Sequence, residues 1–225
     1  MKIGIIGSGN MGRVLGLLWM EKGHSVFFGS QNEKSLAYVQ VNSDKPILSG
    51  TLQQAVQFGD VLFYTLRDRL PADIADLNEW NGKIVIDCNN GTVPEDFIFG
   101  AVTSSYAEMY QANVPGAFIV KAFNTLAQEV FQHDTQTLKN AGAAVYMAGD
   151  DVKSKQIVSG LIHDTGLDPI DMGGLGNSKM LESLADFVRY NMIRNQAGPF
   201  YLLTSKVLPT LSGHRFGDRQ PTKYK

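Results

Sequence analysis

A glycine-rich turn between an apolar run and a helical pattern is the feature that most limits how this chain can fold. The turn reads Gly-Ser-Gly-Asn-Met-Gly over residues 7–12, after the apolar run 1–6 and before the helical pattern 14–19. In such a unit the first glycine permits the tight turn, the second lets backbone approach a pyrophosphate, and the third lets helix pack on strand. The helix N-terminus adds free amides and the positive end of a dipole. Residues 1–32 are therefore predicted to begin a dinucleotide site, with an ordinary glycine turn as the alternative.

Size and charge narrow the class of protein. A chain of 225 residues can bury one sizeable α/β core with a small appended element. Its net charge of −2 gives no footprint for nucleic acid. No apolar stretch approaches the roughly 20 residues that span a bilayer, and the N-terminal run is too short for a signal peptide. We therefore expect a cytoplasmic protein with neither nucleic acid nor membrane as a partner.

The residues that usually carry nucleophilic or metal chemistry are sparse. The single cysteine, Cys88, excludes an internal disulfide, and its place at the end of an apolar run indicates packing. The four histidines lack carboxylate or cysteine partners at recognisable spacing. No metal site and no catalytic side chain are predicted.

Short apolar runs alternate with helical patterns along most of the chain. The runs read as strands buried on both faces: 2–6, 25–28, 61–65, 84–88, 118–123, 143–148 and 169–172. Crossover helices are expected between them, among them 10–22 and 151–164, each followed by glycine. Right-handed connections then predict an α/β fold of the Rossmann-like kind, a doubly wound, mainly parallel sheet whose crevice lies at the carboxyl ends of the strands. We expect this dinucleotide-binding domain over residues 1–165.

Residues 166–225 are predicted to form a small C-terminal element for substrate binding or dimerisation, ending in a tail. Asn177 or Ser178 is expected to cap a helix. One broad face of that helix carries apolar residues at helical spacing: Met180, Leu181, Leu184, Phe187, Val188 and Met192. That face packs in the core, across the crevice mouth or against a second subunit, and we expect a homodimer. The last dozen residues are polar and basic and are expected to form a loose tail.

The adenosine end of the predicted site lacks the acidic residue typical of NAD binding. Such sites place Asp or Glu at the end of the second strand, where the carboxylate binds the ribose hydroxyls. Here Phe28 and Gly29 are followed by a polar segment whose candidate donors are Ser30, Gln31, Asn32 and Lys34. These groups suit a 2′-phosphate, so NADP (NADPH) is favoured over NAD, with ordinary turn residues as the alternative.

Further cofactor contacts are expected from the loops that follow the strands. The pyrophosphate is assigned to the turn residues Gly7, Ser8, Gly9, Asn10, Met11 and Gly12. The nicotinamide end is assigned to residues at three later strand ends: Thr65, Leu66, Arg67, Asn89, Asn90 and Asn124. Each asparagine offers an acceptor and two donors that match a carboxamide or ribose. For the Asn89–Asn90 pair, turn formation is the alternative.

Several longer blocks carry a resemblance to a known family. They comprise residues 2–35, the run Ile86-Asp87-Cys88-Asn89-Asn90, the run Ile119-Val120-Lys121-Ala122-Phe123-Asn124-Thr125, and residues 166–184. Over residues 2 to about 195 the chain resembles the NADPH-dependent F420 (deazaflavin) reductases. It is similar also to the cytoplasmic reductase domain of the six-transmembrane metalloreductases. The haem-bearing membrane portion of those proteins has no counterpart here, so membrane ferric reduction is not carried over.

The resemblance implies hydride transfer between NADP(H) and a small-molecule acceptor, a flavin or deazaflavin ring such as coenzyme F420, FMN or FAD. It also implies that the second ring lies near Thr125, Leu126, Leu175, Asn177 and Ser178. Transfer between two stacked rings needs near-attack geometry in a dry crevice more than acid or base groups. The family usually has arginine where this chain has Gln31, which weakens the expected NADP preference.

Two other functions are alternatives to hydride transfer between NADP(H) and a ring. A β-hydroxyacid dehydrogenase is suggested by Gly174, Gly176 and Lys179, but this lysine is one residue too close for that pattern. Glu182-Ser183 also replaces the expected asparagines, and the remaining chain is too short for the helical domain. An NADP-binding redox sensor or accessory subunit stays open, because its binding residues would look the same. NADPH oxidation by an acceptor separates the two.

Overall fold

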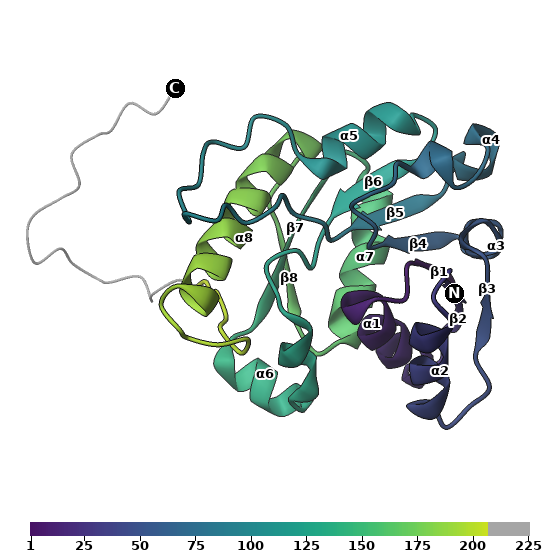
Figure 1. The fold of residues 1–225 in the computed structure, drawn as a ribbon, viewed down its shortest axis with the longest axis horizontal. Coiled ribbons are helices and arrows are strands. Elements are labelled where there is room, and N and C mark those ends of the chain that lie inside the picture. Colours follow the sequence, from purple (N-terminus) through teal and green to yellow (C-terminus); the bar gives the residue numbers. More distant parts are fainter. Residues whose placement is uncertain (207–225) are drawn as a thin grey trace, which may run out of the picture.

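The computed structural model describes residues 1–206, which form an α/β fold around a single eight-stranded sheet (Figure 1). The strand order is β3-β2-β1-β4-β5-β6-β7-β8. The strands are β1 (Lys2–Ile6), β2 (Ser25–Gly29), β3 (Leu48–Gly50), β4 (Val61–Tyr64), β5 (Ile84–Asp87), β6 (Phe118–Lys121), β7 (Ala144–Gly149) and β8 (Asp168–Asp171). The predicted Rossmann-like, mainly parallel sheet is confirmed. The short strand β3 was not predicted, because its residues are exposed or half-buried and give no apolar run.

Helices and short 3-10 turns connect the strands. The α-helices are α1 (Asn10–Glu21), α2 (Glu33–Val41), α3 (Leu52–Phe58), α4 (Leu77–Trp80), α5 (Tyr106–Asn113), α6 (Thr135–Ala141), α7 (Val152–Asp164) and α8 (Ser178–Ile193). The 3-10 turns are η1 (Pro71–Asp73), η2 (Gln128–Gln132) and η3 (Leu175–Asn177). The helices predicted over 10–22 and 151–164 correspond to α1 and α7 within one residue at their ends.

Two apolar cores lie on the two faces of the sheet. On one face α1 and α7 pack together, and the indole Nε1 of Trp19 donates to the carbonyl of Leu161 at 3.0 Å. The Trp19 ring meets Phe63 edge-on, with centroids 5.4 Å apart. On the other face α3 and α5 cover a second cluster that includes Tyr64 and Tyr110. Full burial of each large apolar side chain stabilises the fold by about 1.5–3 kcal/mol, so the sheet forms a rigid base for the loops at its edge.

The sheet order reverses between β1 and β4. Strands β2 and β3 lie on one side of β1, and β4, β5 and β6 follow on the other side, all parallel to it. Connections that leave a parallel sheet in opposite directions open a crevice at the carboxyl ends of the strands at this point. The glycine-rich turn after β1 and the loops after β4, β5 and β6 therefore meet at one edge.

Strand β7 departs from the parallel arrangement. It runs antiparallel to β6, and the register joins only Val120 with Gly149 and Lys121 with Ala148. Because the last residues of both strands pair, the earlier part of β7 extends past the end of β6, where it pairs in parallel with β8. Helix α8 packs against β7. Figure 1 shows β7, β8 and α8 grouped together at the end of the sheet that lies away from β3.

The helix that Asn177 or Ser178 was expected to cap is confirmed as α8, with Asn177 at the N-cap position, but the Asn177 side chain makes no capping hydrogen bond. The predicted apolar face of α8 is divided. Leu181 and Val188 are buried, whereas Met180 and Phe187 are 51% and 53% exposed. The surface that β7 and the crevice loops offer is narrower than the apolar face of α8, so it covers only part of that face. The division into residues 1–165 and 166–225 stays a prediction, and the predicted tail lies outside the described residues. Within residues 1–206 no helix combines the length and the apolar character needed to cross a bilayer.

Candidate functional site

The glycine-rich turn has the conformation that the sequence predicted. Gly7 has a φ of +101°, a left-handed value that favours glycine, and its N–H donates to the carbonyl of Gly29 at 3.0 Å. A Cβ atom at Gly12 would lie 2.0 Å from the carbonyl oxygen of Gly7, so this glycine allows α1 to start against the strand. A Cβ atom at Gly9 would meet nothing within 4 Å. The turn thus leaves open backbone at its middle glycine, which fits the cradle that a pyrophosphate requires.

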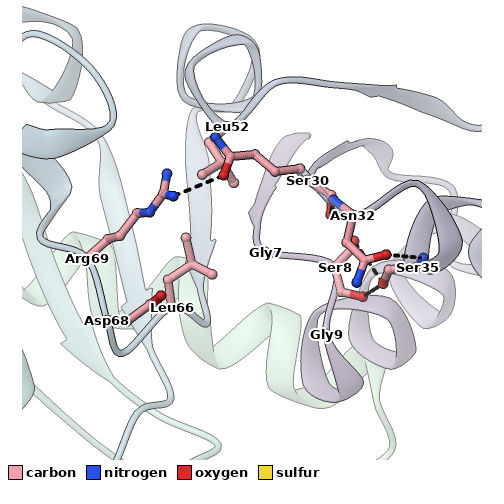
Figure 2. A pocket seen from close by; sticks show the side chains of 11 residues that line it. Gly7, Ser8, Gly9, Ser30, Asn32, Ser35, Leu52, Leu66, Asp68 and Arg69 are labelled. Atoms are coloured by element: carbon pink, nitrogen blue, oxygen red, sulfur yellow. Dashed lines mark hydrogen bonds between the residues drawn. The ribbon is translucent and has the colours of Figure 1, made fainter.

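A first cavity of about 300 Å³ lies between this turn, the end of β2 and the loop after β4 (Figure 2). Its lining residues are Gly7, Ser8, Gly9, Ser30, Gln31, Asn32, Ser35, Leu52, Leu66, Asp68 and Arg69. The predicted residues of the glycine-rich turn and those of the segment after β2 therefore line one cavity. Lys34 is not among the lining residues and is exposed in the first turn of α2.

Ser35 joins the turn to α2 and was missed in the sequence. The Ser35 hydroxyl donates to the carbonyl oxygen of Ser8, and the Ser8 hydroxyl donates to Ser35 Oγ at 3.0 Å. The Ser35 N–H in turn donates to Oδ1 of Asn32, the N-cap of α2, at 3.2 Å. An asparagine three residues before a serine at a helix start is the local signal that points to this cap. Asn32 therefore has a structural role in addition to its place in the cavity wall.

The first cavity also contains an arginine that sequence reasoning did not assign to the site. Arg69 extends from the loop after β4, and its Nη2 donates to Oε1 of Gln31 at 3.0 Å (Figure 2). The two residues are 38 positions apart, so no local pattern joins them. Asp68, next in the loop, lines the same cavity and is exposed.

A second cavity of about 360 Å³ continues along the same edge and shares Gly9 with the first. It is lined by Gly9, Asn10, Met11, Thr65, Arg67, Cys88, Asn89, Asn90, Phe123, Asn124, Leu126 and Arg189. The structure thus brings together the predicted residues of the turn and those at the ends of β4, β5 and β6. Thr65 joins the end of β4 to the glycine-rich turn, because its hydroxyl lies within donating distance of the carbonyls of Ile6 and Gly7, at 3.1 and 2.9 Å.

Asn90 and Asn124 bind each other across the second cavity. Asn90 Nδ2 donates to the carbonyl of Asn124 at 2.7 Å, and Asn124 Nδ2 donates to Asn90 Oδ1 at 2.9 Å and to the carbonyl of Leu181 at 2.8 Å. Within residues 1–206, Asn124 Oδ1 is buried and has no hydrogen-bond partner. Phe123 before it has a left-handed φ of +63° and a buried ring, so core packing holds the bend that directs Asn124.

Asn89 is tied to the framework beneath the cavity. Its Nδ2 lies within hydrogen-bond distance of three acceptors, namely the carbonyls of Tyr64 and Leu66 at 3.2 and 3.3 Å and the Tyr110 hydroxyl at 3.2 Å. The Nδ2 hydrogens of Asn89 are therefore already engaged within the fold, and the predicted contact of Asn89 with a nicotinamide stays a prediction. Its position supports the loops after β4 and β5.

A buried ion cluster lies directly below the nicotinamide end. Lys121 Nζ is 2.9 Å from Asp87 Oδ2 and 2.6 Å from Glu182 Oε1, and Asp87 and Lys121 are fully buried. Lys121 also donates to the backbone carbonyl of Asn89. Burial alone would lower the pKa of Lys121, but the two carboxylates together raise it above its ordinary value. Burial raises the pKa of Glu182 against the opposing effect of Lys121.

Sequence reasoning did not identify this cluster, although a signal is present. Asp87 and Lys121 lie within the apolar runs 84–88 and 118–123, which read as strands buried on both faces, and they end β5 and β6. Charged residues at such positions need a partner, and the neighbouring strand end is the nearest place for one. Glu182 comes from α8, whose direction the sequence did not reveal.

A third cavity of about 410 Å³ adjoins the second and is walled by α8. Its lining residues are Asn10, Met11, Arg67, Asn90, Asn124, Thr125, Leu126, Ala127, Gln128, Glu129, Ala185, Val188, Arg189 and Met192. Thr125 and Leu126, which the resemblance assigned to a second ring, line this cavity, and their contact with such a ring stays a prediction. Arg189 was missed, and its guanidinium donates to the carbonyl of Gly91 at 2.5 Å and pairs with Asp186.

Three residues that the resemblance assigned to the second ring do not line any of these cavities. Leu175 is buried in the core. Ser178 is also buried, and its Oγ donates to the carbonyl of Leu175 at 2.5 Å. Asn177 Nδ2 donates to the carbonyl of Met172 at 2.6 Å. The three residues lie at the start of α8, and the residues of α8 that face the cavity come about two to four turns later.

Cys88 lies in the wall of the second cavity. Burial raises the pKa of its thiol, so the sulfur stays protonated at neutral pH, as a packing residue would. In the part of the chain that the structure describes, no three His, Cys, Asp or Glu side chains are placed to hold a metal ion.

Comparisons with known proteins agree with the geometry. The model of the family described as NADP oxidoreductase coenzyme F420-dependent matches residues 2–91. The chain is 28% identical to metalloreductase STEAP3 of Rattus norvegicus over 93% of its length, and 26% identical to metalloreductase STEAP2 of Mus musculus over 81%. It spans 38% and 35% of these two proteins.

Solved structures show the same fold. A candidate F420-dependent NADP reductase from Arthrobacter sp. FB24 superposes with a TM-score of 0.77 at 20% identity, covering 92% of this chain and all of that one. The hypothetical protein SMa0349 from Sinorhizobium meliloti has a TM-score of 0.64 at 26% identity, covering 80% of this chain and 88% of that one. The resemblance read from the sequence is confirmed: the chain is similar to the coenzyme F420-dependent NADP oxidoreductases and to the metalloreductases, and residues 2–91 match the model of the former family.

Proposed function

We propose that the protein transfers a hydride between NADP(H) and a flavin or deazaflavin ring such as coenzyme F420, FMN or FAD. The carrying observation is the continuous row of three cavities along the carboxyl edge of the sheet. The first and second share Gly9. The second and third share Asn10, Met11, Arg67, Asn90, Asn124, Leu126 and Arg189. A dinucleotide along the first two would end beside the third.

Different residues along the three cavities would bind the different parts of the dinucleotide. Ser30, Gln31 and Arg69 would surround the adenosine ribose, the open backbone at Gly9 would hold the pyrophosphate, and the Asn90–Asn124 pair would lie beside the nicotinamide. When bound, the cofactor supplies the hydride that the acceptor takes up. The Asn90–Asn124 pair keeps this end of the row in one geometry.

The walls of the third cavity suit a flat ring. Met11, Leu126, Val188 and Met192 present apolar surface, and Arg67 is an exposed cation at the same cavity. Burial of Leu126 and Val188 limits access of water to the inner wall. Hydride transfer requires reacting atoms about 3–3.5 Å apart, and walls on rigid elements make such a distance reproducible.

The electron and proton balance requires little of the side chains. Two electrons and one proton pass together as a hydride, which oxidises NADPH to NADP⁺, and the reduced acceptor takes its further proton from solvent. The chain has only to bind, orient and shield the two rings. The expectation that no side chain acts as an acid or base therefore stays a prediction.

The test is oxidation of NADPH by a panel of coenzyme F420, FMN and FAD, followed through the absorbance of the reduced nicotinamide, with NADH in parallel. We expect turnover with at least one ring, faster with NADPH than with NADH. Gly9→Val is the control variant, because it should lose turnover while keeping the fold. Tight NADPH binding without oxidation by any acceptor would contradict the proposal and favour a redox sensor or accessory subunit. The predicted homodimer and cytoplasmic location are separate expectations, to be checked by light scattering and by fractionation.

A further inference from the structure

The loop after β4 places a cation opposite the end of β2. In Figure 2 the Arg69 side chain extends from this loop toward the segment that carries Ser30 and Asn32. Its Nη2 reaches Oε1 of Gln31 at 3.0 Å. The end of β2 itself carries neither the acid of an NAD site nor an arginine.

Buried hydroxyl groups fix the backbone from which Arg69 extends. The Tyr64 hydroxyl donates to the carbonyl of Arg69 at 2.8 Å, and the Tyr110 hydroxyl donates to the carbonyl of Leu66 at 2.9 Å. Burial raises the pKa of both phenols, so they remain protonated donors. The N–H of Leu70 donates to Asp73 at 3.2 Å. The loop therefore fixes the backbone of Arg69 before any ligand binds.

Most of the donor capacity of this arginine is unspent. A guanidinium has five N–H donors, and within residues 1–206 Arg69 makes one side-chain hydrogen bond and no ion pair. The neighbouring Asp68 carboxylate is exposed and does not pair with it in this part of the chain. The positive charge is thus available to a ligand in the first cavity.

Other donors converge on the same place. Ser30 Oγ accepts from the N–H of Asn32 at 3.0 Å, which leaves the Ser30 hydroxyl hydrogen to donate outward. The side-chain oxygen of Gln31 accepts the hydrogen bond from Arg69, so the uncharged amide group of Gln31 lies beside the guanidinium in the cavity wall. A phosphate dianion suits a planar guanidinium with hydroxyl and amide donors beside it, because parallel N–H groups bind two oxygens at once.

From this juxtaposition we infer that Arg69 recognises the 2′-phosphate of NADP(H) and sets the preference for NADP over NAD, an inference that rests on the proposed use of NADP(H). The arginine comes from the loop after β4, and so compensates for Gln31 at the end of β2. Ser30 and Gln31 complete the contact. NADH lacks the phosphate, so the side chain contributes little to NADH binding.

The test compares dissociation constants for NADPH and NADH in the full chain and in Arg69→Met. We expect NADPH binding to weaken about 10- to 100-fold, as for loss of hydrogen bonds to a charged group, while NADH binding changes less than about twofold. Arg194→Met is the matched control, because it removes one exposed cation beyond α8 and should change neither constant. Arg69→Lys keeps the charge without the planar fork and should give an intermediate loss for NADPH.

A rescue variant separates recognition from a structural role. Gln31→Arg in the Arg69→Met background returns a guanidinium to the cavity from β2 and should restore most of the NADPH affinity. Equal losses for NADPH and NADH, or unchanged NADPH binding in Arg69→Met, would overturn the inference while leaving the proposed function in place. Failure of the unaltered chain to bind either dinucleotide would overturn both.

Discussion

At the proposed adenosine end of the crevice Ser30, Gln31 and Arg69 stand on loops and are exposed or half-buried, whereas at the proposed nicotinamide end Asn124 and the ion cluster of Asp87, Lys121 and Glu182 are buried. Gln31 and Arg69 meet through one hydrogen bond in an open cavity. Asn124 and Lys121 are held by several bonds among β5, β6 and α8. The difference matches two tasks. Affinity and discrimination tolerate small movements, but hydride transfer between rings does not.

The buried end is costly to build. Removing a lysine and two carboxylates from water costs several kcal/mol per ion, which the attraction between them only offsets when the geometry is good. Lys121 also binds the carbonyl of Asn89, so the cluster fixes the loop that carries Asn90. We interpret the cluster as the support that keeps the nicotinamide end in one arrangement.

The largest expected effect comes from breaking the cluster. Lys121→Met leaves Asp87 and Glu182 buried without their cation and should lower the free energy of unfolding by about 3–5 kcal/mol. Denaturant unfolding measures this value. The more exposed pair Lys179–Glu108, with side chains 39% and 30% exposed, is the control, since Lys179→Met should cost no more than about 1 kcal/mol. A loss in Lys121→Met as small as that of the control would show that the two ends do not differ as described.

A substitution in the shared turn should affect binding without affecting stability. Gly9 has extended backbone with φ of −66° and open space at its Cβ position, so Gly9→Val should fold normally. The added methyl groups would occupy the cofactor position and weaken NADPH binding at least about 100-fold, or about 2.7 kcal/mol. Gly16→Val is the opposite control, because its Cβ would lie 2.4 Å from Phe28 and should destabilise the fold. Normal NADPH affinity in Gly9→Val would place the dinucleotide elsewhere.

The smallest expected effect is a pH dependence of the buried end. The pKa of Lys121 in the fold is above its ordinary value of 10.5, so its stabilisation is present below that pH and is lost as pH rises through the folded pKa. The difference in unfolding free energy between the unaltered chain and Lys121→Met should therefore shrink above pH 10.5, by at most about 1.4 kcal/mol per pH unit. Other groups that titrate in alkali are present in both proteins. A difference that stays constant with pH would contradict the assigned pKa shift.

Local patterns predicted most of the fold. The apolar runs that became β1, β2 and β4 to β8 and the glycine turn carry their signals within a few residues. The antiparallel direction of β7 could not be predicted, because the sequence pattern of a buried strand is the same in either direction. The position of Lys34 outside the cavity depends on where α2 begins, one residue after its Asn32 cap.

The site was predictable where contacts lie near the strand ends. The loops after β4, β5 and β6 follow from topology alone, so Thr65, Asn90 and Asn124 were placed at the second cavity. Contacts between distant segments were not predictable. Arg69 meets Gln31 only because the loop after β4 bends toward β2, and Arg189 faces the cavities only because α8 packs on β7.

A crystal structure of the chain with NADPH would show whether one dinucleotide spans the first two cavities. We expect the adenosine phosphate between Ser30 and Arg69, the pyrophosphate over Gly9, and the nicotinamide beside Asn90 and Asn124. A dinucleotide bound elsewhere, or a nicotinamide turned away from the third cavity, would contradict this expectation.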